Sequence, residues 1–306
     1  MKLAFAGTPG FAATVLRGIL DSKHEVGLVI SQPDRPRGRG RKVTRSPVAE
    51  LATEVGLPLK QPARISEVAD EISTHDALVV AAYGQILRAD TLYGARLGAW
   101  NVHASILPRY RGAAPIERAI MAGERETGVS FMQMDAGLDT GPFALQLRTP
   151  IPPEMTGGEL TDTLARLGAK AVVEGMSKLS KSSLTLIEQD SERATYAPKL
   201  GNQESVIKWG ENVQNVHDLV RALTPHIGAR AHHPDWSGPV KVLRSRISEK
   251  NVRNQDPGSI LPANDRIMVA CGEGVLEILE LQTPGSKVLS AVDFLRGRRL
   301  GGSFSP

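Results

Sequence analysis

The chain has 306 residues, of which 41% are hydrophobic and 23% are charged, and its net charge at pH 7 is +4. This is the composition of an ordinary globular protein, and no apolar run approaches the roughly 20 residues that a membrane span needs, so we expect no membrane partner. The single cysteine excludes an internal disulfide, and the amino terminus enters a strand-like segment without a secretion signal. We therefore expect a cytoplasmic protein. The length of the chain favours two domains.

The first half of the chain alternates short β-rich runs with amphipathic stretches. The predicted strands are 2–6, 26–31, 78–83, 100–103 and 129–134, and the predicted helices are 11–20, 47–55, 65–73, 114–122 and 156–179. Strands that alternate with helices in this way are typical of a parallel sheet with crossover helices. We therefore predict an α/β fold, a Rossmann-like and mostly parallel sheet with helices on both faces.

The remainder of the chain has a different pattern. Residues 181–202 are largely polar, and a helix is predicted at 213–222. Short apolar segments follow, separated by Gly, Pro, Asn and Asp, which suggests a small β-barrel; they are 240–243, 259–261, 267–270 and 275–279. We predict a catalytic domain at 1–185, a linker at 186–203 and a C-terminal barrel domain at 204–306.

Basic residues are concentrated between positions 35 and 45, where six occur without an acidic one: Arg35, Arg37, Arg39, Arg41, Lys42 and Arg45. Charge runs are usually only solvated and flexible. Here Gly38 and Gly40 interleave with arginine, which favours a mobile loop that presents guanidinium groups to phosphates. Ser46 and Pro47 are expected to end this basic arm by starting the next helix.

The residues that indicate chemistry are Asn101, His103 and Asp139. Strand side chains repeat every second residue, so the amide of Asn101 and the imidazole of His103 are expected on one face. Asp139 follows the predicted strand 129–134 and stands between Gly137 and Gly141, in a turn that can return its carboxylate to the imidazole. We predict one polar cluster at the strand ends, where ligands bind in open α/β sheets.

Such a cluster suits attack on a carbonyl, because an amide and an imidazolium can hold the developing oxyanion while a carboxylate orients the imidazole or takes up a proton. No nucleophile from the protein is indicated. Cys271 lies in an apolar context far along the chain, and no Gly-x-Ser-x-Gly elbow is present. Direct transfer between two bound substrates is therefore favoured over an acyl-enzyme.

Several motifs have plainer interpretations. Gly7-Thr8-Pro9-Gly10 joins a strand to a helix, but Pro9 stands where a dinucleotide fingerprint needs its second glycine, so we expect a structural turn or a wall of the acceptor site. The histidines other than His103 lack metal-ligand spacing, and we predict no metal site. Taken singly, Asn101, His103 and Asp139 would be read as a turn former, a structural histidine and a loop cap.

Over nearly its whole length the chain resembles the methionyl-tRNA formyltransferase family, part of the wider family that moves formyl groups from 10-formyltetrahydrofolate. The resemblance rests on five segments: Phe5-Ala6-Gly7-Thr8-Pro9, Gln32-Pro33-Asp34-Arg35-Pro36, Asn101-Val102-His103, Leu107-Pro108-Arg109-Tyr110-Arg111-Gly112-Ala113-Ala114-Pro115-Ile116 and Gly137-Leu138-Asp139-Thr140-Gly141. It implies formyl transfer from 10-formyltetrahydrofolate to the α-amine of methionyl-initiator tRNA.

The resemblance also implies roles for named residues. Asn101, His103 and Asp139 become the catalytic residues, and the folate is expected against Ser105, Ile106, Leu107 and Pro108. The acceptor stem of the initiator tRNA is expected to meet Arg35, Arg37, Arg39, Arg41 and Lys42. The C-terminal region is expected to be an oligonucleotide-binding-type barrel that assists tRNA binding.

Two rival functions use the same residues. A formyltransferase for a small amine, such as a glycinamide ribonucleotide or an amino sugar nucleotide, would keep the catalytic trio but needs neither the basic arm nor the C-terminal barrel. A noncatalytic RNA-binding protein on a degenerate enzyme scaffold would not need an intact trio. The roles of Arg109, Arg111 and Arg118 stay open, and a monomer is expected because no strong exposed apolar helix stripe is evident.

Overall fold

The structure is a computed structural model that describes residues 1–37, 42–248 and 255–305. Arg39 and Arg41 of the predicted tRNA-binding set lie outside the described residues. The chain divides into two compact units: the first takes in residues 1–115, 126–149 and 161–197, and the second takes in residues 116–125, 150–160 and 198–306. No helix in the described part of the chain is both long and apolar enough to cross a membrane.

A seven-stranded sheet forms the centre of the first unit, with the order β5-β2-β1-β6-β7-β8-β9. The five strands from β5 to β7 pair in parallel, whereas β8 runs antiparallel to β7. Their bounds are β1 Lys2–Gly7, β2 Glu25–Ile30, β5 Leu59–Lys60, β6 Ala77–Ala81, β7 Ala99–His103, β8 Glu126–Gln133 and β9 Phe143–Pro150. The predicted Rossmann-like, mostly parallel sheet is confirmed.

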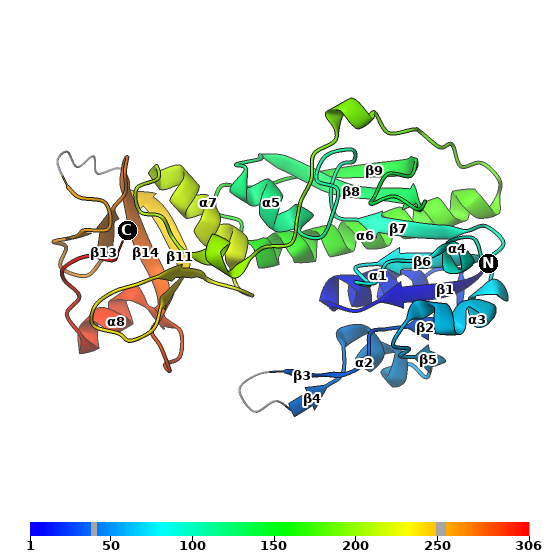
Figure 1. Ribbon diagram of the computed structural model, residues 1–306, viewed down its shortest axis with the longest axis horizontal. Helices are drawn as coiled ribbons and strands as arrows, with labels where there is room; N and C mark the ends of the chain where they lie inside the picture. The colour runs from blue at the N-terminus through cyan, green and yellow to red at the C-terminus, as the bar shows by residue number, and fades with distance from the viewer. Residues whose placement is uncertain (38–41, 249–254, 306) are drawn as a thin grey trace. The chain divides into compact units, whose positions relative to one another are not determined.

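Helices cover both faces of this sheet, and the residues of β1, β2, β6 and β7 are almost all buried. On one face α1 (Gly10–Leu20) packs against α2 (Pro47–Glu54) and α6 (Gly157–Ser180), with Gly18 close to Ala169. The opposite face joins residues such as Leu78 and Val80 to η1 (Ile65–Val68), α3 (Ala69–Ser73) and α4 (Ala89–Leu92) in one core. Figure 1 shows α6 running along the sheet.

The basic arm begins and ends as a hairpin, in which β3 (Arg35–Arg37) pairs antiparallel with β4 (Lys42–Thr44) beside α2 (Figure 1). Ser46 caps α2, since its Oγ accepts from the backbone N–H of Ala49 at 3.1 Å, and Pro47 occupies the first helical turn. The helix start predicted at Ser46 and Pro47 is confirmed. Gln61 Nε2 donates to Asp34 Oδ1 at 2.7 Å, which ties the base of the hairpin to the segment that follows β5.

The second unit is built on an antiparallel half-barrel of six strands, with the order β10-β11-β14-β13-β12 and β15 paired to β14. The strands are β10 Ala229–Ala231, β11 Val240–Ser248, β12 Ile260–Leu261, β13 Ile267–Ala270, β14 Val275–Gln282 and β15 Leu289–Ser290. The helices of this unit include α7 (Val213–Leu223) and α8 (Ala291–Gly297), while α5 (Pro115–Met121) lies largely in it. Trp209 and Phe304 stack at 5.4 Å in its core. The small C-terminal β-barrel domain predicted from the sequence is confirmed as an antiparallel half-barrel.

Candidate active site

Asn101 and His103 reach the site from the carboxyl end of β7. Between them, Val102 points to the other face of the sheet, where an added Cβ on Gly168 of α6 would meet its side chain. Because strand side chains alternate, Asn101 and His103 share the face opposite α6. Both are nearly buried, at 9% and 6% exposure. The structure thus places the amide and the imidazole side by side, as the Asn-x-His spacing predicts.

Asp139 lies in the turn between β8 and β9, with its backbone in the left-handed region at φ 54°. The turn is closed by Asp135, whose Oδ1 accepts from the backbone N–H of Gly137 at 3.0 Å and from Thr140 Oγ1 at 2.7 Å. Gly141 follows the turn, and a Cβ there would collide with the carbonyl oxygen of Gln133. The sequence Gly137–Gly141 therefore folds back on β8 and returns the Asp139 side chain to the strand ends.

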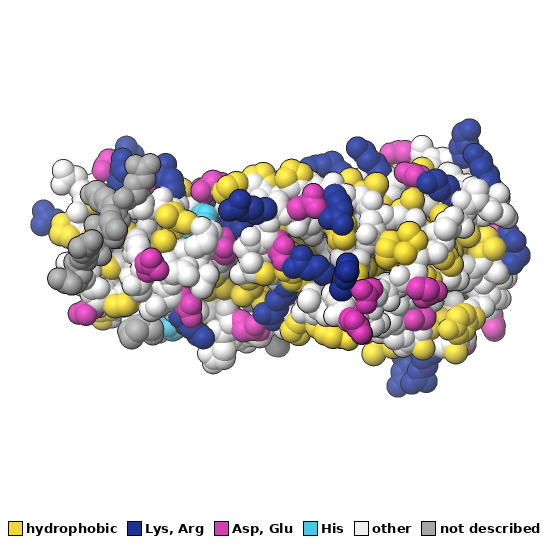
Figure 2. Space-filling model, turned by 90° about the horizontal axis from the view of Figure 1, so that it is seen from above, with side chains coloured by type: hydrophobic (Ala, Val, Ile, Leu, Met, Phe, Trp, Pro, Cys, Tyr) yellow, Lys and Arg dark blue, Asp and Glu magenta, His cyan; other side chains and the backbone are white. Residues whose placement is uncertain are grey.

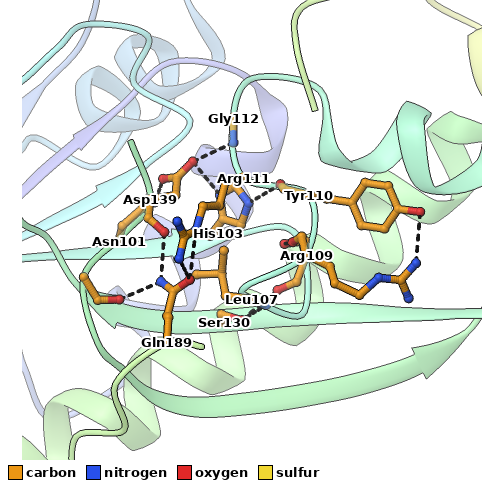
Figure 3. A network of polar contacts seen from close by, with 12 residues as sticks. Asn101, His103, Leu107, Arg109, Tyr110, Arg111, Gly112, Ser130, Asp139 and Gln189 are labelled. Carbon is orange, nitrogen blue, oxygen red and sulfur yellow. Dashed lines mark hydrogen bonds and ion pairs between the residues drawn. The ribbon is translucent and has the colours of Figure 1, made fainter. Parts of the chain in front are cut away.

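The three predicted catalytic side chains meet around the Asp139 carboxylate (Figure 3). Its Oδ1 accepts from Asn101 Nδ2 at 3.5 Å, and its Oδ2 lies 3.6 Å from His103 Nδ1. The same Oδ2 accepts from the backbone N–H of Gly112 at 2.8 Å, so the carboxylate is held by the loop that follows β7. The structure brings Asn101, His103 and Asp139 into one cluster.

The hydrogen bond of Nε2 sets the orientation of the His103 ring. His103 Nε2 lies 2.9 Å from the carbonyl oxygen of Tyr110. A carbonyl can only accept, so Nε2 carries a proton. Nδ1 is therefore the nitrogen that faces Asp139, as a lone pair in the neutral ring and as a donor in the imidazolium.

The segment predicted to hold the folate follows β7 and is held by hydrogen bonds to side chains of β8 and β9. Leu107 donates its backbone N–H to Ser130 Oγ at 3.0 Å, and its carbonyl accepts from Gln146 Nε2 at 2.8 Å. Ser105 and Leu107 are buried, whereas Ile106 and Pro108 are partly exposed. The side chains of Ile106 and Pro108 are therefore the members of the predicted set that can contact a ligand.

The three arginines whose roles stayed open have different surroundings. Arg111 is buried, at 3% exposure, and its Nε and Nη2 donate to Gln189 Oε1 at 3.1 and 2.8 Å. Arg118 forms an ion pair with Glu204 in the second unit, with Nη1 2.6 Å from Oε1. Arg109 lies 5.2 Å from the ring centre of Tyr110. Of these three, Arg111 is the one whose buried side chain lies next to the Asp139 turn, through its contact with Gln189.

Sequence reasoning missed Gln189, which contacts the Asp139 turn directly. Its Nε2 donates to the carbonyl oxygens of Asp139 and Gly141 at 2.8 and 2.7 Å (Figure 3). Gln189 lies in a polar stretch without periodicity, 50 residues after Asp139. No spacing signal in this chain points to it.

The segments that follow β1 and β6 contact one another. Thr8 Oγ1 donates to the carbonyl oxygen of Tyr83 at 3.1 Å, so the side chain of this turn makes a hydrogen bond within the protein. An added Cβ on Gly7 would lie 2.6 Å from that of Ala12. Desolvation, with a smaller effect of the Glu67 charge, raises the pKa of Tyr83 to about 12, so its phenol stays protonated at neutral pH. The structural interpretation of the turn is supported.

On the face drawn in Figure 2, the Lys and Arg side chains of the described residues are interspersed with Asp and Glu and with apolar side chains. In the arm, Arg35 and Arg45 are exposed, and Arg45 Nε lies 4.0 Å from Asp34 Oδ2. In the sequence, this arm holds six basic residues and no acidic one.

Both parts of the chain match one class of protein. The formyl transferase family matches residues 1–176, and its C-terminal domain matches residues 199–299. The fold also resembles an N-formyltransferase from Helicobacter canadensis, solved with folinic acid and dTDP-3-aminofucose, with a TM-score of 0.67 and 18% identity over 91% of this chain and 98% of that one.

The relatives with higher identity narrow that class. A methionyl-tRNA formyltransferase of Rubrobacter xylanophilus is 63% identical over 303 residues, which is 99% of each chain. One of Methylobacterium nodulans is 46% identical over 306 residues, covering 98% of this chain and 97% of that protein. The chain belongs to the methionyl-tRNA formyltransferase family.

Proposed function

We propose that Asn101, His103 and Asp139 promote the transfer of a formyl group between two bound substrates. The observation that carries this proposal is their convergence: Asn101 Nδ2 and His103 Nδ1 lie at 3.5 and 3.6 Å from the two oxygens of one carboxylate. Two donors and an acceptor at one point match what attack of an amine on a formyl carbon requires. In this account His103 acts through Nδ1, because Nε2 is bonded to Tyr110.

The reaction of the family transfers the formyl group of 10-formyltetrahydrofolate to the α-amino group of methionyl-initiator tRNA, giving N-formylmethionyl-tRNA for translation initiation. The amine nitrogen forms a bond to the formyl carbon, and the bond from that carbon to N10 of the folate breaks. The amine loses a proton and N10 gains one. No covalent intermediate with the protein is needed.

The three residues have separate tasks in this proposal. Asn101 Nδ2 and protonated His103 Nδ1 donate to the formyl oxygen as it becomes negative. Asp139 stabilises the imidazolium of His103 and accepts the amine proton, directly or through water. The cluster is nearly buried, with Asp139 at 14% side-chain exposure, so these interactions act in a medium of low dielectric, where they are stronger than in water.

Substrate binding is proposed to use the residues that flank the cluster. Ser105 to Pro108 would hold the folate, with the partly exposed side chains of Ile106 and Pro108 against its flat ring. The acceptor stem of the tRNA would meet the basic arm, where Arg35, Arg37, Arg39, Arg41 and Lys42 can pair with phosphates. We further propose a monomer and, because translation begins there, a place in the cytoplasm.

The acceptor is tested by measuring formyl transfer from 10-formyltetrahydrofolate to three acceptors in parallel: methionyl-initiator tRNA, methionyl-elongator tRNA and glycinamide ribonucleotide. We expect strong preference for the initiator. Activity confined to the small amine would keep the catalytic residues as assigned and overturn the acceptor, and would leave the basic arm without its proposed role.

A further inference from the structure

Residues 186–197, which we name the strap, lie along the active-site loop of the first unit. At one end of the strap, Ile187 exchanges two backbone hydrogen bonds with Phe143 of β9, at 2.9 and 3.0 Å. At the other end, Thr195 and Ala197 bond to the backbone of Tyr110 to Ala114, including Arg111 N–H to Thr195 O at 2.8 Å. The strap therefore joins the loop after β7 to the start of β9, on either side of the Asp139 turn.

Gln189 lies near the middle of the strap, and every donor and acceptor of its side-chain amide is hydrogen-bonded here. Both N–H groups are donated to the Asp139 turn, one to the carbonyl of Asp139 and one to that of Gly141. Both lone pairs of Oε1 are occupied by the Nε and Nη2 groups of Arg111. Because a carbonyl cannot donate and a guanidinium cannot accept, the amide has only one possible orientation.

Arg111 strengthens this arrangement because it is buried and has no carboxylate partner among the residues that the structure describes. Its contact with the amide oxygen is charge-assisted, and such bonds are shorter and stronger than neutral ones. By drawing electron density toward Oε1, the guanidinium makes the Nε2 hydrogens better donors to the turn. The charge of Arg111 thus acts on Asp139 through Gln189.

The two carbonyls that Gln189 binds flank Thr140, and Asp139 itself has a positive φ of 54°. That backbone region is uncommon for residues other than glycine and persists where neighbouring groups hold it. A peptide rotation at this turn would move the Asp139 carboxylate away from Asn101, His103 and the N–H of Gly112. Gln189 resists such a rotation, because it would break both donated bonds.

We propose that Gln189, oriented by Arg111, is a positioning residue for the reaction, which fixes the backbone of the Asp139 turn and so keeps the carboxylate in register with Asn101 and His103. This inference rests on the proposed function of Asp139. The strap is then a structural part of the active site, although its sequence is polar and was expected to belong to a linker.

Gln189→Glu separates the hydrogen bonds that Gln189 accepts from Arg111 from those that it donates to the Asp139 turn. A glutamate at this position still accepts from Arg111, now as an ion pair, so the buried guanidinium keeps a partner. It cannot donate to the carbonyls of Asp139 and Gly141, and it places negative charge beside them. The exposed Gln203 of η3 (Asn202–Ser205), in the second unit, offers the matched control, since Gln203→Glu makes the same change in charge at a residue that does not belong to the proposed site.

We expect Gln189→Glu to lower kcat by about 10- to 100-fold, because misplacement of a reacting group by about 1 Å can cost that much. The KM values for 10-formyltetrahydrofolate and methionyl-initiator tRNA should stay within about threefold of wild type, since neither substrate contacts Gln189 in this account. Gln203→Glu should leave kcat unchanged. Unaltered kcat in Gln189→Glu, or a rise in KM alone, would overturn the proposal.

A double-mutant cycle with Asp139→Asn identifies the route by which Gln189 acts. If Gln189 works through the Asp139 carboxylate, adding Gln189→Glu to Asp139→Asn should lower kcat by less than about threefold more. An undiminished loss in that background would overturn the positioning role while leaving the catalytic role of Asp139 intact. Wild-type kcat in Asp139→Asn alone would instead refute the proposed function. Far-ultraviolet circular dichroism and Tm of each variant show whether the fold is retained.

Discussion

His103 Nε2 donates to the carbonyl oxygen of Tyr110 across 2.9 Å, which turns Nδ1 toward Asp139. This relationship ties the imidazole to the loop after β7 and leaves Nδ1 as the nitrogen that would meet the substrate in the proposed function. The same loop supplies the N–H of Gly112 to the Asp139 carboxylate. One short segment, Tyr110 to Gly112, therefore orients both titratable members of the cluster.

The orientation of His103 predicts which replacement retains more activity. The amide nitrogen of an asparagine can occupy the position of Nδ1, whereas that of a glutamine reaches the position of Nε2. We expect His103→Ala to lower kcat by roughly 100-fold or more, and His103→Asn to be more active than His103→Gln. Single-turnover rates of the three variants check this order. Greater activity in His103→Gln would mean that Nε2 is the reacting nitrogen.

Arg39 is predicted to contact phosphate in the acceptor stem. Arg39→Ala should raise the KM for methionyl-initiator tRNA. It should also make the slope of log affinity against log salt concentration shallower, by the amount expected for the loss of about one phosphate contact. Binding measured between about 50 and 200 mM salt checks the slope. Equal slopes in the variant and wild type would show that the arm plays no part in binding.

Asp218 and Arg221 form a buried ion pair in the second unit, with Nε 2.6 Å from Oδ1 and side-chain exposures of 3% and 6%. Removing one partner leaves the other charge buried and unpaired, so Asp218→Asn should lower the free energy of unfolding by about 3 kcal/mol. Glu174→Gln breaks the exposed pair with Lys178 and should cost under about 0.5 kcal/mol. Urea denaturation compares the two, and equal losses would contradict the argument from burial.

Cys271 is buried, and desolvation raises the pKa of its thiol to about 11. In the unfolded chain the pKa is about 8.5, so between these values the unfolded state binds fewer protons than the folded state. The free energy of unfolding therefore falls as the pH rises through this window. We expect the native thiol to resist a disulfide reagent at pH 8 and to react once guanidinium unfolds the chain. Rapid labelling of native protein would contradict this.

Much of the first unit could be predicted from sequence, because β1, β2 and β6 are apolar runs that stand out against amphipathic helices. The apolar runs that became β1, β2, β6 and β7 were identified in this way, and Asn101 and His103 at the end of β7 were predicted to share a face. The positive φ of Asp139 is consistent with a turn bounded by glycines, and its approach to His103 was predicted, whereas its hydrogen bonds with Gly112 and Gln189 were not.

Other features depend on tertiary contacts that leave no local pattern. Strand β5 has two residues, and β9 is partly exposed along most of its length without a clean alternation, so neither has a periodic signal. The stem of the hairpin β3–β4 lies in a charged run that favours a loop. Gln189 and Arg111 acquire their roles only because the strap folds back onto the Asp139 turn, which depends on pairing between distant parts of the chain.

The central claim is that Asn101, His103 and Asp139 carry out the formyl transfer, and the most direct test is the single-turnover rate of Asn101→Ala with both substrates saturating. The account predicts a loss of about 100-fold or more, since one oxyanion donor is removed. The Kd for methionyl-initiator tRNA, measured separately, should be nearly unchanged. A wild-type rate in this variant would remove Asn101 from the mechanism and contradict the proposed site.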